Sequence, residues 1–310
     1  MTKQRMTATS LIALALVAVA VAVAASASAS SSGVSDAQAK NVCPGGKVRF
    51  GVEPYDTGAK FLGAYQTLTS LLQKKLHCSV KLYVATSYTA EVEAMRAKKL
   101  DVGEFGPLGY IFAKKLAKAQ PVAVFATKDR KPVVYYAALW VPSGSSITSV
   151  KGLVGKTLAL SDPASTSGNL FPLYALKKAG VSQDSVKIQY AGSHSASLLA
   201  LVNGKVDAAE VNSQQQATAS AAGTFDASKY RRIWRSNPIP NDPITVRGDL
   251  SPAFKTAVKK ALLSLKPAEL AALDTELGVD SGPMIAGKDS FYTQIRELVK
   301  LLGIDINHIG

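Results

Sequence analysis

Residues 161–172 read Ser161-Asp162-Pro163-Ala164-Ser165-Thr166-Ser167-Gly168-Asn169-Leu170-Phe171-Pro172. Three adjacent hydroxyl residues precede a glycine and an apolar run that is typical of a helix. A helix start carries backbone N–H groups without partners and the positive end of the helix dipole, and the hydroxyls add donors there. This combination suits a tetrahedral oxyanion such as phosphate. The alternative is a serine that caps an ordinary helix.

Strand-like and helix-like stretches alternate on both sides of this segment. Strands are expected over 47–52, 80–84, 100–103, 135–141, 158–160, 186–190 and 206–209. Helices are expected over 61–72, 90–98, 170–179 and 197–202, and again from residue 251 onward. This alternation predicts parallel α/β architecture, and two such series in 310 residues predict two domains.

The N-terminus has the pattern of a secretory signal peptide. Lys3 and Arg5 precede an apolar run over 11–25, which gives way to small residues. We expect residues 1–28 to be the signal peptide and 29–43 a flexible leader. The alternative is a retained membrane anchor. The protein is therefore expected to be exported, periplasmic or extracellular, and soluble after cleavage.

The chain has two cysteines, Cys43 and Cys78. An even pair in an exported protein favours a disulfide. Each cysteine precedes a predicted strand, and adjacent parallel strands would bring the two together. Two free buried thiols are the alternative.

The charge balance is strongly basic, with 36 Lys and Arg against 22 Asp and Glu. The net charge of +14 falls to +12 when the two cations Lys3 and Arg5 leave with the signal peptide. The remaining lysines are scattered over predicted helices, and no long basic run or nucleic-acid motif is present. We therefore expect a solvated basic surface and no nucleic-acid partner.

Seven segments in register resemble the substrate-binding proteins of phosphate, phosphite and phosphonate ABC transporters. They are 50–56, 85–90, 100–108, 162–168, 191–194, 203–208 and 239–244. The resemblance implies a two-lobed type II periplasmic-binding-protein fold, in which each lobe is a mixed sheet flanked by helices. By analogy, one lobe would combine 44–138 with 246–310, and the other would be 139–245. Motif loops at the carboxyl ends of strands agree with this placement.

The resemblance also implies roles for the hydroxyl triplet and two aromatic residues. Ser165, Thr166 and Ser167 would donate hydrogen bonds to the oxygens of the ligand. Tyr88 would add a phenolic donor from the opposite lobe, with a surface tyrosine as the alternative. His194 opens a helix, and its imidazole would donate to a phosphoryl oxygen, more strongly when protonated.

The remaining candidates bear on the choice of ligand. Asp242 would accept a hydrogen bond from a protonated oxygen or meet the amine of an aminophosphonate; its alternative is a turn at 241–243. Phe105 and Tyr110 would line the cleft, with core packing as the alternative. Where aminophosphonate binders carry a second acid, this chain has Gln214 by register, although Glu210 is close by. We therefore favour phosphate, phosphite or a small alkylphosphonate.

The predicted function is a solute-binding protein that delivers a phosphorus oxyanion to the membrane permease of an ABC transporter, as a monomer without a cofactor. The alternatives are a binding protein for another oxyanion such as a sulfonate, a sensor module, and a secreted hydrolase that uses the triplet with His194. The sequence contains no Gly-x-Ser-x-Gly elbow. Three histidines and two cysteines assemble no convincing metal cluster. No acid that would orient His194 is evident, so we expect binding rather than catalysis.

Overall fold

The structure is a computed structural model that describes residues 42–279 and 282–308. The predicted signal peptide and residues 29–41 of the predicted leader lie outside the described residues. Among the residues that are described, no helix combines the length and the apolar character that a membrane span requires.

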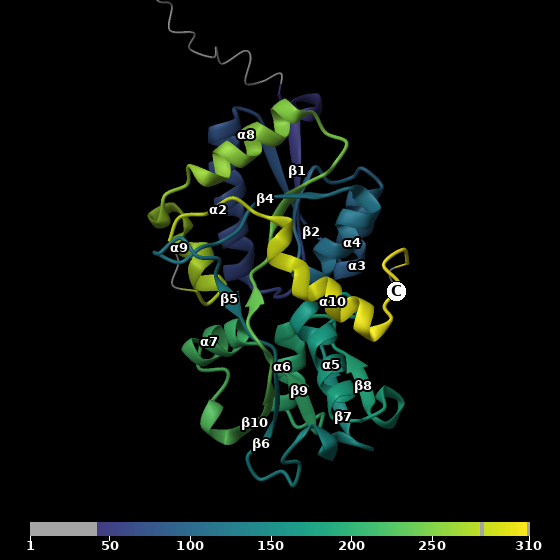
Figure 1. The fold of residues 1–310 in the computed structure, drawn as a ribbon. Coiled ribbons are helices and arrows are strands. Elements are labelled where there is room, and N and C mark those ends of the chain that lie inside the picture. The colour runs from purple at the N-terminus through teal and green to yellow at the C-terminus, as the bar shows by residue number, and fades with distance from the viewer. Residues whose placement is uncertain (1–41, 280–281, 309–310) are drawn as a thin grey trace, which may run out of the picture. The chain divides into compact units, whose positions relative to one another are not determined.

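The first lobe is built on a mixed sheet (Figure 1). Its described strands follow the order β2 (Ser79–Val84), β1 (Lys47–Val52), β3 (Val102–Glu104), β12 (Ile244–Val246) and β4 (Gln120–Ala123). The first three are parallel, and β12 is antiparallel to both of its neighbours. One face packs against α2 (Ala59–Leu76), α8 (Pro252–Leu263) and α9 (Pro267–Glu276). The other packs against α3 (Tyr88–Arg96), α4 (Pro107–Ala117) and α10 (Thr293–Leu302).

The second lobe repeats this plan. Its described strands follow the order β10 (Tyr230–Arg235), β6 (Ala138–Pro142), β9 (Ala208–Glu210), β7 (Thr157–Leu160) and β8 (Lys187–Tyr190). The last three are parallel, whereas β6 is antiparallel to β9 and β10. Helix α5 (Phe171–Lys178) covers one face, and α6 (His194–Val202) and α7 (Ser213–Ala221) cover the other. The expected two-lobed fold with mixed sheets is confirmed.

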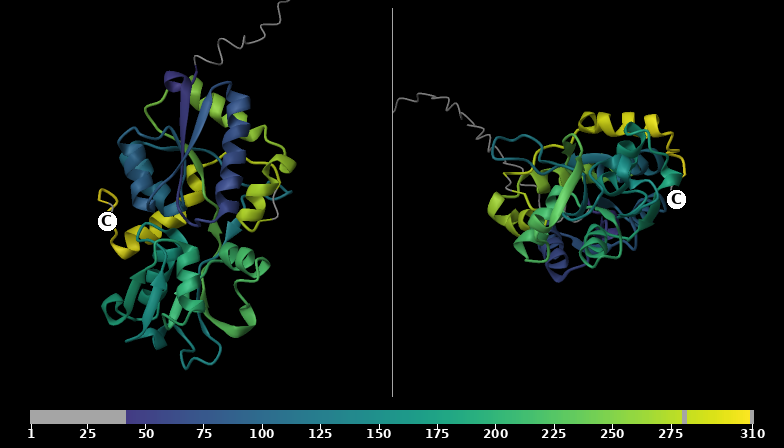
Figure 2. Two further views of the ribbon diagram at one scale, coloured as in Figure 1. Left: turned by 180° about the vertical axis from the view of Figure 1, so that it is seen from behind. Right: turned by 90° about the horizontal axis from the view of Figure 1, so that it is seen from below.

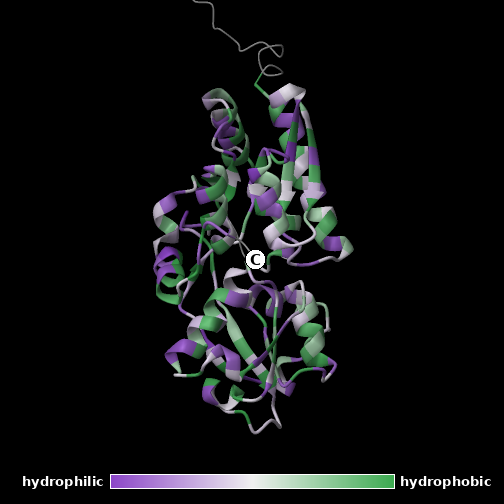
Figure 3. Ribbon diagram, turned by 90° about the vertical axis from the view of Figure 1, so that its right-hand side faces the viewer, coloured by the Kyte–Doolittle hydropathy of each residue, from purple (hydrophilic) through white to green (hydrophobic). Residues whose placement is uncertain are grey.

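Helix α2 illustrates how the sequence sets these layers. Its buried apolar side chains recur three or four residues apart, at Phe61, Ala64, Tyr65, Leu68, Leu72 and Leu76. This spacing places them on one face of the helix, against the alternating side chains Val48, Phe50 and Val52 of β1. Figure 3 shows hydrophobic and hydrophilic residues alternating along the helices in the same way.

A disulfide joins Cys43 to Cys78, as predicted. The two cysteines precede β1 and β2, which run parallel with Lys47 opposite Ser79. The two parallel strands therefore start side by side. The disulfide links their N-terminal ends and lies on the side of the lobe opposite to the carboxyl ends of the strands.

The chain passes between the lobes twice. The first passage lies between β4 and β6 and the second between β10 and β12, and they pair with each other through β5 (Val134–Tyr135) and β11 (Ile239–Pro240). The predicted boundaries at 138/139 and 245/246 lie near these passages but stay predictions. Helix α10 contacts both α4 and α5, at the level where the lobes meet (Figure 2). The short helical turns are Pro44–Gly46, Val150–Leu153, Gln183–Ser185, Ala227–Lys229 and Asp289–Tyr292.

Candidate functional site

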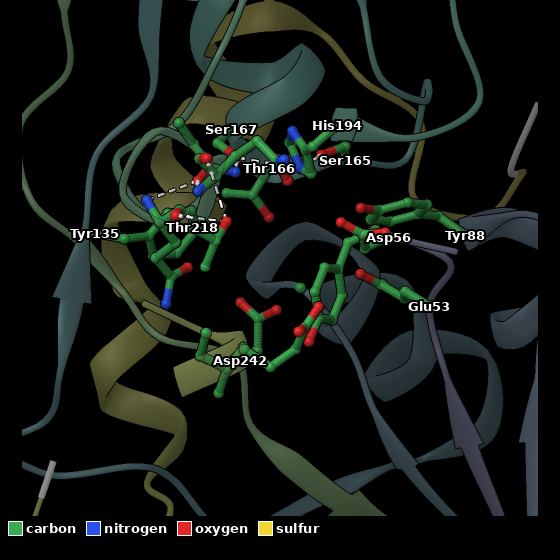
Figure 4. Close-up of a pocket in the computed structure, with 17 residues that line it drawn as sticks. Glu53, Asp56, Tyr88, Tyr135, Ser165, Thr166, Ser167, His194, Thr218 and Asp242 are labelled. Atoms are coloured by element: carbon green, nitrogen blue, oxygen red, sulfur yellow. Dashed lines mark hydrogen bonds between the residues drawn. The ribbon is translucent and has the colours of Figure 1, made fainter. Parts of the chain in front are cut away.

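A pocket of about 40 Å³ lies between the loops that follow strands of both sheets (Figure 4). A water molecule needs about 10–15 Å³ on the same measure, so the pocket has room for roughly three waters or one small anion. The first lobe contributes Glu53, Tyr55, Asp56, Tyr88, Gly106, Glu276 and Leu277. The second contributes Ser165, Thr166, Ser167, His194, Asn212, Gln214, Gln215 and Thr218, and the passages between lobes contribute Tyr135 and Asp242.

The hydroxyl triplet forms the upper wall of the pocket in Figure 4. Ser165 caps a wide, π-type helical turn over Thr166–Leu170, which leads into α5, and its Oγ accepts a hydrogen bond from the Gly168 N–H at 3.1 Å. The sequence predicted a regular helix from residue 170. The structure differs in that a wide turn precedes this helix. A Cβ at Gly168 would lie 1.6 Å from Ser161 Oγ, so only glycine fits there. The turn therefore holds three buried hydroxyls side by side.

The same loop carries hydrogen bonds between the lobes. Thr166 Oγ1 accepts from the Leu108 N–H at 2.8 Å, at the start of α4, where the N-cap Gly106 offers no side chain. Asp162 Oδ2 accepts from the Tyr88 N–H at 3.4 Å, at the start of α3. Side chains of the second lobe therefore satisfy backbone donors at two helix starts of the first lobe.

The side chain of Glu210 orients the His194 ring. The two side chains are buried, and His194 Nδ1 lies 2.7 Å from Glu210 Oε2. The other ring nitrogen, Nε2, lies 3.4 Å from Ser165 Oγ and 3.5 Å from Ser167 Oγ. Burial alone would lower the pKa of His194, but the carboxylate of Glu210 outweighs it and the pKa is raised. The sequence did not identify an acid that orients His194; the structure provides Glu210.

Carboxyl groups face the hydroxyl loop from the other side. Burial raises the pKa of Asp242 to about 7, and the charge of His194 opposes this shift. Burial, and then the charges of Glu91 and Asp242, raise the pKa of Glu53 well above its usual value. Among the described residues that line the pocket, none is a lysine or an arginine. His194 is therefore the one cationic side chain that this lining offers.

Buried tyrosines complete the wall of donors. Burial raises the pKa values of Tyr88 and Tyr135 well above the usual value of 10. Both phenols are therefore protonated at physiological pH and able to donate.

The structure brings six of the eight predicted ligand-binding residues to one pocket. They are Tyr88, Ser165, Thr166, Ser167, His194 and Asp242. Phe105 and Tyr110 do not line it. Both are fully buried in the hydrophobic core of the first lobe, where the Tyr110 hydroxyl donates to Asp289 at 2.7 Å. The two residues therefore pack in the core, which was the alternative to lining the cleft.

Sequence reasoning missed several lining residues, of which Glu53 and Asn212 matter most here. Glu53 directly follows β1 within a segment that carried the family resemblance, and it is 2% exposed. Asn212 follows β9 and caps α7. Their position immediately after a buried strand was the available signal.

Comparisons with known proteins agree with this geometry. A sequence profile described as "ABC transporter, phosphonate, periplasmic substrate-binding protein" matches residues 50–287. The chain is 30% identical over 234 residues to the phosphonates-binding periplasmic protein of Escherichia coli (strain K12), which covers 73% of this chain and 68% of that protein. It is 27% identical over 210 residues to the phosphate-import protein PhnD of Mycolicibacterium smegmatis, with 64% and 65% covered.

Solved structures share the fold. PhnD1 from Prochlorococcus marinus, in complex with methylphosphonate, has a TM-score of 0.74 at 22% identity and covers 84% of this chain and 99% of its own. A binding protein component of an ABC phosphonate transporter from Pseudomonas aeruginosa also has a TM-score of 0.74, at 23% identity, and the coverage is 83% and 86%.

Proposed function

We propose, because the chain belongs to the family of periplasmic substrate-binding proteins of phosphonate ABC transporters, that it captures a small phosphorus oxyanion between its lobes. The observation that carries this proposal is the convergence of three buried hydroxyls and the His194 imidazole on one small pocket. Uncharged donors in a site of low dielectric bind an oxyanion strongly because little water competes with them. The methylphosphonate bound to PhnD1 and the phosphate import assigned to the Mycolicibacterium smegmatis relative support this ligand class.

The proposed role has two further parts that follow from the family and the sequence. Export would be directed by the segment 1–28, and the captured ligand would be passed to a membrane permease with its own ATPase. The loop with Asp162 and Thr166 would couple ligand binding to lobe closure, because it accepts hydrogen bonds from the first turns of α3 and α4 in the first lobe. The permease would recognise the closed form.

Binding, and not turnover, is the function we propose for the Ser165–His194–Glu210 arrangement. The serine, the histidine and the acid contact one another in the same sequence as in a catalytic triad. This is the specific observation in favour of a hydrolase. The comparisons favour binding, because the matched family consists of periplasmic substrate-binding proteins. In addition, Ser165 Oγ already accepts the Gly168 N–H. We expect no release of nitrophenol from p-nitrophenyl phosphate or acetate; a rate that disappears in Ser165→Ala would contradict this.

Calorimetric titration of the refolded, ligand-free protein tests the proposal. Phosphate, phosphite, methylphosphonate, 2-aminoethylphosphonate and sulfate are titrated separately. We expect tight binding of at least one phosphorus oxyanion. Ser165→Ala or Ser167→Ala should each weaken it by roughly 1–3 kcal/mol, the usual cost of a lost buried partner. Ser146→Ala, on an exposed loop of the second lobe, is the matched control. No binding of any of the five anions would refute the proposal.

A further inference from the structure

The end of the first lobe that lies farthest from the second lobe is strongly basic. It is formed by the start of β1, the end of α2 and part of α8, and Figure 1 shows α8 and the start of β1 there. The stretches of sequence that contain these elements, 42–52, 57–90 and 250–268, include no aspartate or glutamate. Five lysines of these stretches make up what we call the basic end, namely Lys47, Lys74, Lys75, Lys259 and Lys260.

An apolar groove brings lysines of separate elements together at the basic end. The groove has a volume of about 400 Å³, and Lys75 of α2 and Lys260 of α8 both line it. Apolar side chains line it as well, among them Val42, Leu76 and Ala261. The lysines are therefore not a scattered surface charge, because they flank one shallow apolar depression.

The positive charge of the basic end is not compensated within the described part of the chain. None of its five lysines forms an ion pair with a described residue; four are exposed, and Lys75 is half-buried. Helix dipoles favour the cations in the last turns of α2 and α8, which include Lys74, Lys75 and Lys260. They account neither for Lys47 and Lys259 nor for the lack of acids in all three stretches.

This charge lies too far from the pocket to attract the ligand. Asp56 lines the pocket, and α2 begins at Ala59 and runs from there to the basic end. The 18 residues of α2 span about 27 Å at a rise of about 1.5 Å per residue. Salt screens exposed charges over about 8 Å at physiological ionic strength, which is less than a third of this length. The basic end therefore serves a partner other than the ligand.

An anionic membrane surface matches the chemistry of the basic end. Clustered lysines bind anionic head groups by charge, and the apolar groove between them suits the boundary between head groups and acyl chains. Lysine side chains can lay their apolar stems along such a groove while their ammonium groups reach the lipid phosphates. The chain also enters the lobe at Val42, within the groove, so the predicted export segment 1–28 joins the protein at this end.

We propose that the basic end docks the exported protein on anionic lipid, with its five lysines against the lipid phosphates. The pocket lies one helix length away, so the docked protein captures its ligand while it is held at the membrane. Docking through exposed charges is weak and sensitive to salt, which allows the protein to leave the lipid when it meets the permease. Docking uses no residue of the pocket and is therefore independent of the proposed function.

Sedimentation with lipid vesicles tests docking on the processed protein, from residue 29 onward. Vesicles of phosphatidylcholine alone are compared with vesicles in which about one third of the lipid is phosphatidylglycerol. We expect binding to the anionic vesicles only, and loss of that binding as the salt concentration rises from about 0.05 M to about 0.5 M. No binding to anionic vesicles at low salt, or equal binding to both kinds of vesicle, would overturn the proposal.

Two variants that lose the same charge locate the contact. The first combines four substitutions at the basic end, Lys74→Gln, Lys75→Gln, Lys259→Gln and Lys260→Gln. The matched control combines four at exposed lysines of the second lobe, Lys151→Gln, Lys178→Gln, Lys187→Gln and Lys205→Gln. We expect anionic vesicles to bind the first variant at least about tenfold more weakly and the control within about twofold of the wild type. Equal losses in both would show that net charge alone attracts the protein, and would refute docking through the basic end.

Further measurements separate docking from ligand capture and from a protein partner. The variant at the basic end should keep the wild-type melting temperature and affinity for methylphosphonate. Ser165→Ala should bind anionic vesicles as the wild type does; a loss would assign lipid binding to the pocket and overturn the proposal. Binding to neutral vesicles that carry the permease, with none to anionic lipid, would assign the basic end to a protein partner instead. Vesicle binding without capture of any phosphorus oxyanion would refute the proposed function and leave docking intact.

Discussion

Replacement of Glu210 by glutamine should weaken anion binding through His194 without touching the ligand. Glu210 is fully buried, and its Oε2 lies 2.7 Å from His194 Nδ1. The amide of glutamine keeps the shape of the side chain and an oxygen that accepts the Nδ1–H. It removes the negative charge, so the protonated imidazole loses its stabilisation and the pKa of His194 falls.

The magnitude follows from the change in the hydrogen bond at Nε2. A hydrogen bond that involves a charged group contributes about 1.5–3 kcal/mol, and a neutral one about half as much. Where the wild-type imidazole is protonated and that of the variant is neutral, the variant should therefore bind about 0.8–1.5 kcal/mol more weakly, or about 4–13-fold. As the pH falls, the imidazole of the variant also gains its proton, and the two affinities should converge.

The assay is calorimetric titration with methylphosphonate from pH 5.5 to 8, read as the ratio of the wild-type and variant affinities at each pH. The ratio cancels the pH effects that the wild-type protein and the variant have in common, including the ionisation of the ligand. Imidazole NMR of the ligand-free proteins follows the pKa of His194 directly. Glu297→Gln, an exposed acid on α10, is the control. A folded Glu210→Gln protein with the wild-type affinity at every pH would refute the reasoning.

Three further predictions concern closure and stability. Thr166→Val should weaken binding by roughly 1–3 kcal/mol because it leaves the Leu108 N–H unpaired, and Thr166→Ser should restore most of it; equal affinities in calorimetry would contradict this. The ligand-free protein should lose stability as pH rises from about 4 to about 7, because Asp242 with its raised pKa holds a proton that the unfolded chain releases. Melting temperatures at pH 5 and 8 check this, and Glu91→Gln, which replaces a buried acid that has no hydrogen-bond partner within the described part of the chain, should reduce the difference. Removing the Cys43–Cys78 disulfide, which spans 35 residues, should cost about 3–4 kcal/mol in denaturant unfolding with ligand affinity unchanged.

The sequence by itself determined the local structure and the chemistry of the binding loop. Alternating apolar side chains place β1, and the three- and four-residue spacing places α2, because both patterns depend only on the geometry of one element. The hydroxyl triplet could be predicted as one cluster of donors for the same reason, since adjacent residues remain adjacent in any fold. The cysteine pair was readable because its two strands run parallel from neighbouring starts.

Only the tertiary structure decided which side chains meet across elements. Sequence spacing places neither Glu210 beside His194 nor Thr166 at the start of α4, because these contacts depend on sheet register and on how the lobes meet. The same holds for Phe105, which the sequence allowed in the cleft and the packing of the first lobe buries. The burial of Glu53 also arises from packing, and burial is what raises the pKa of this carboxyl group well above its usual value.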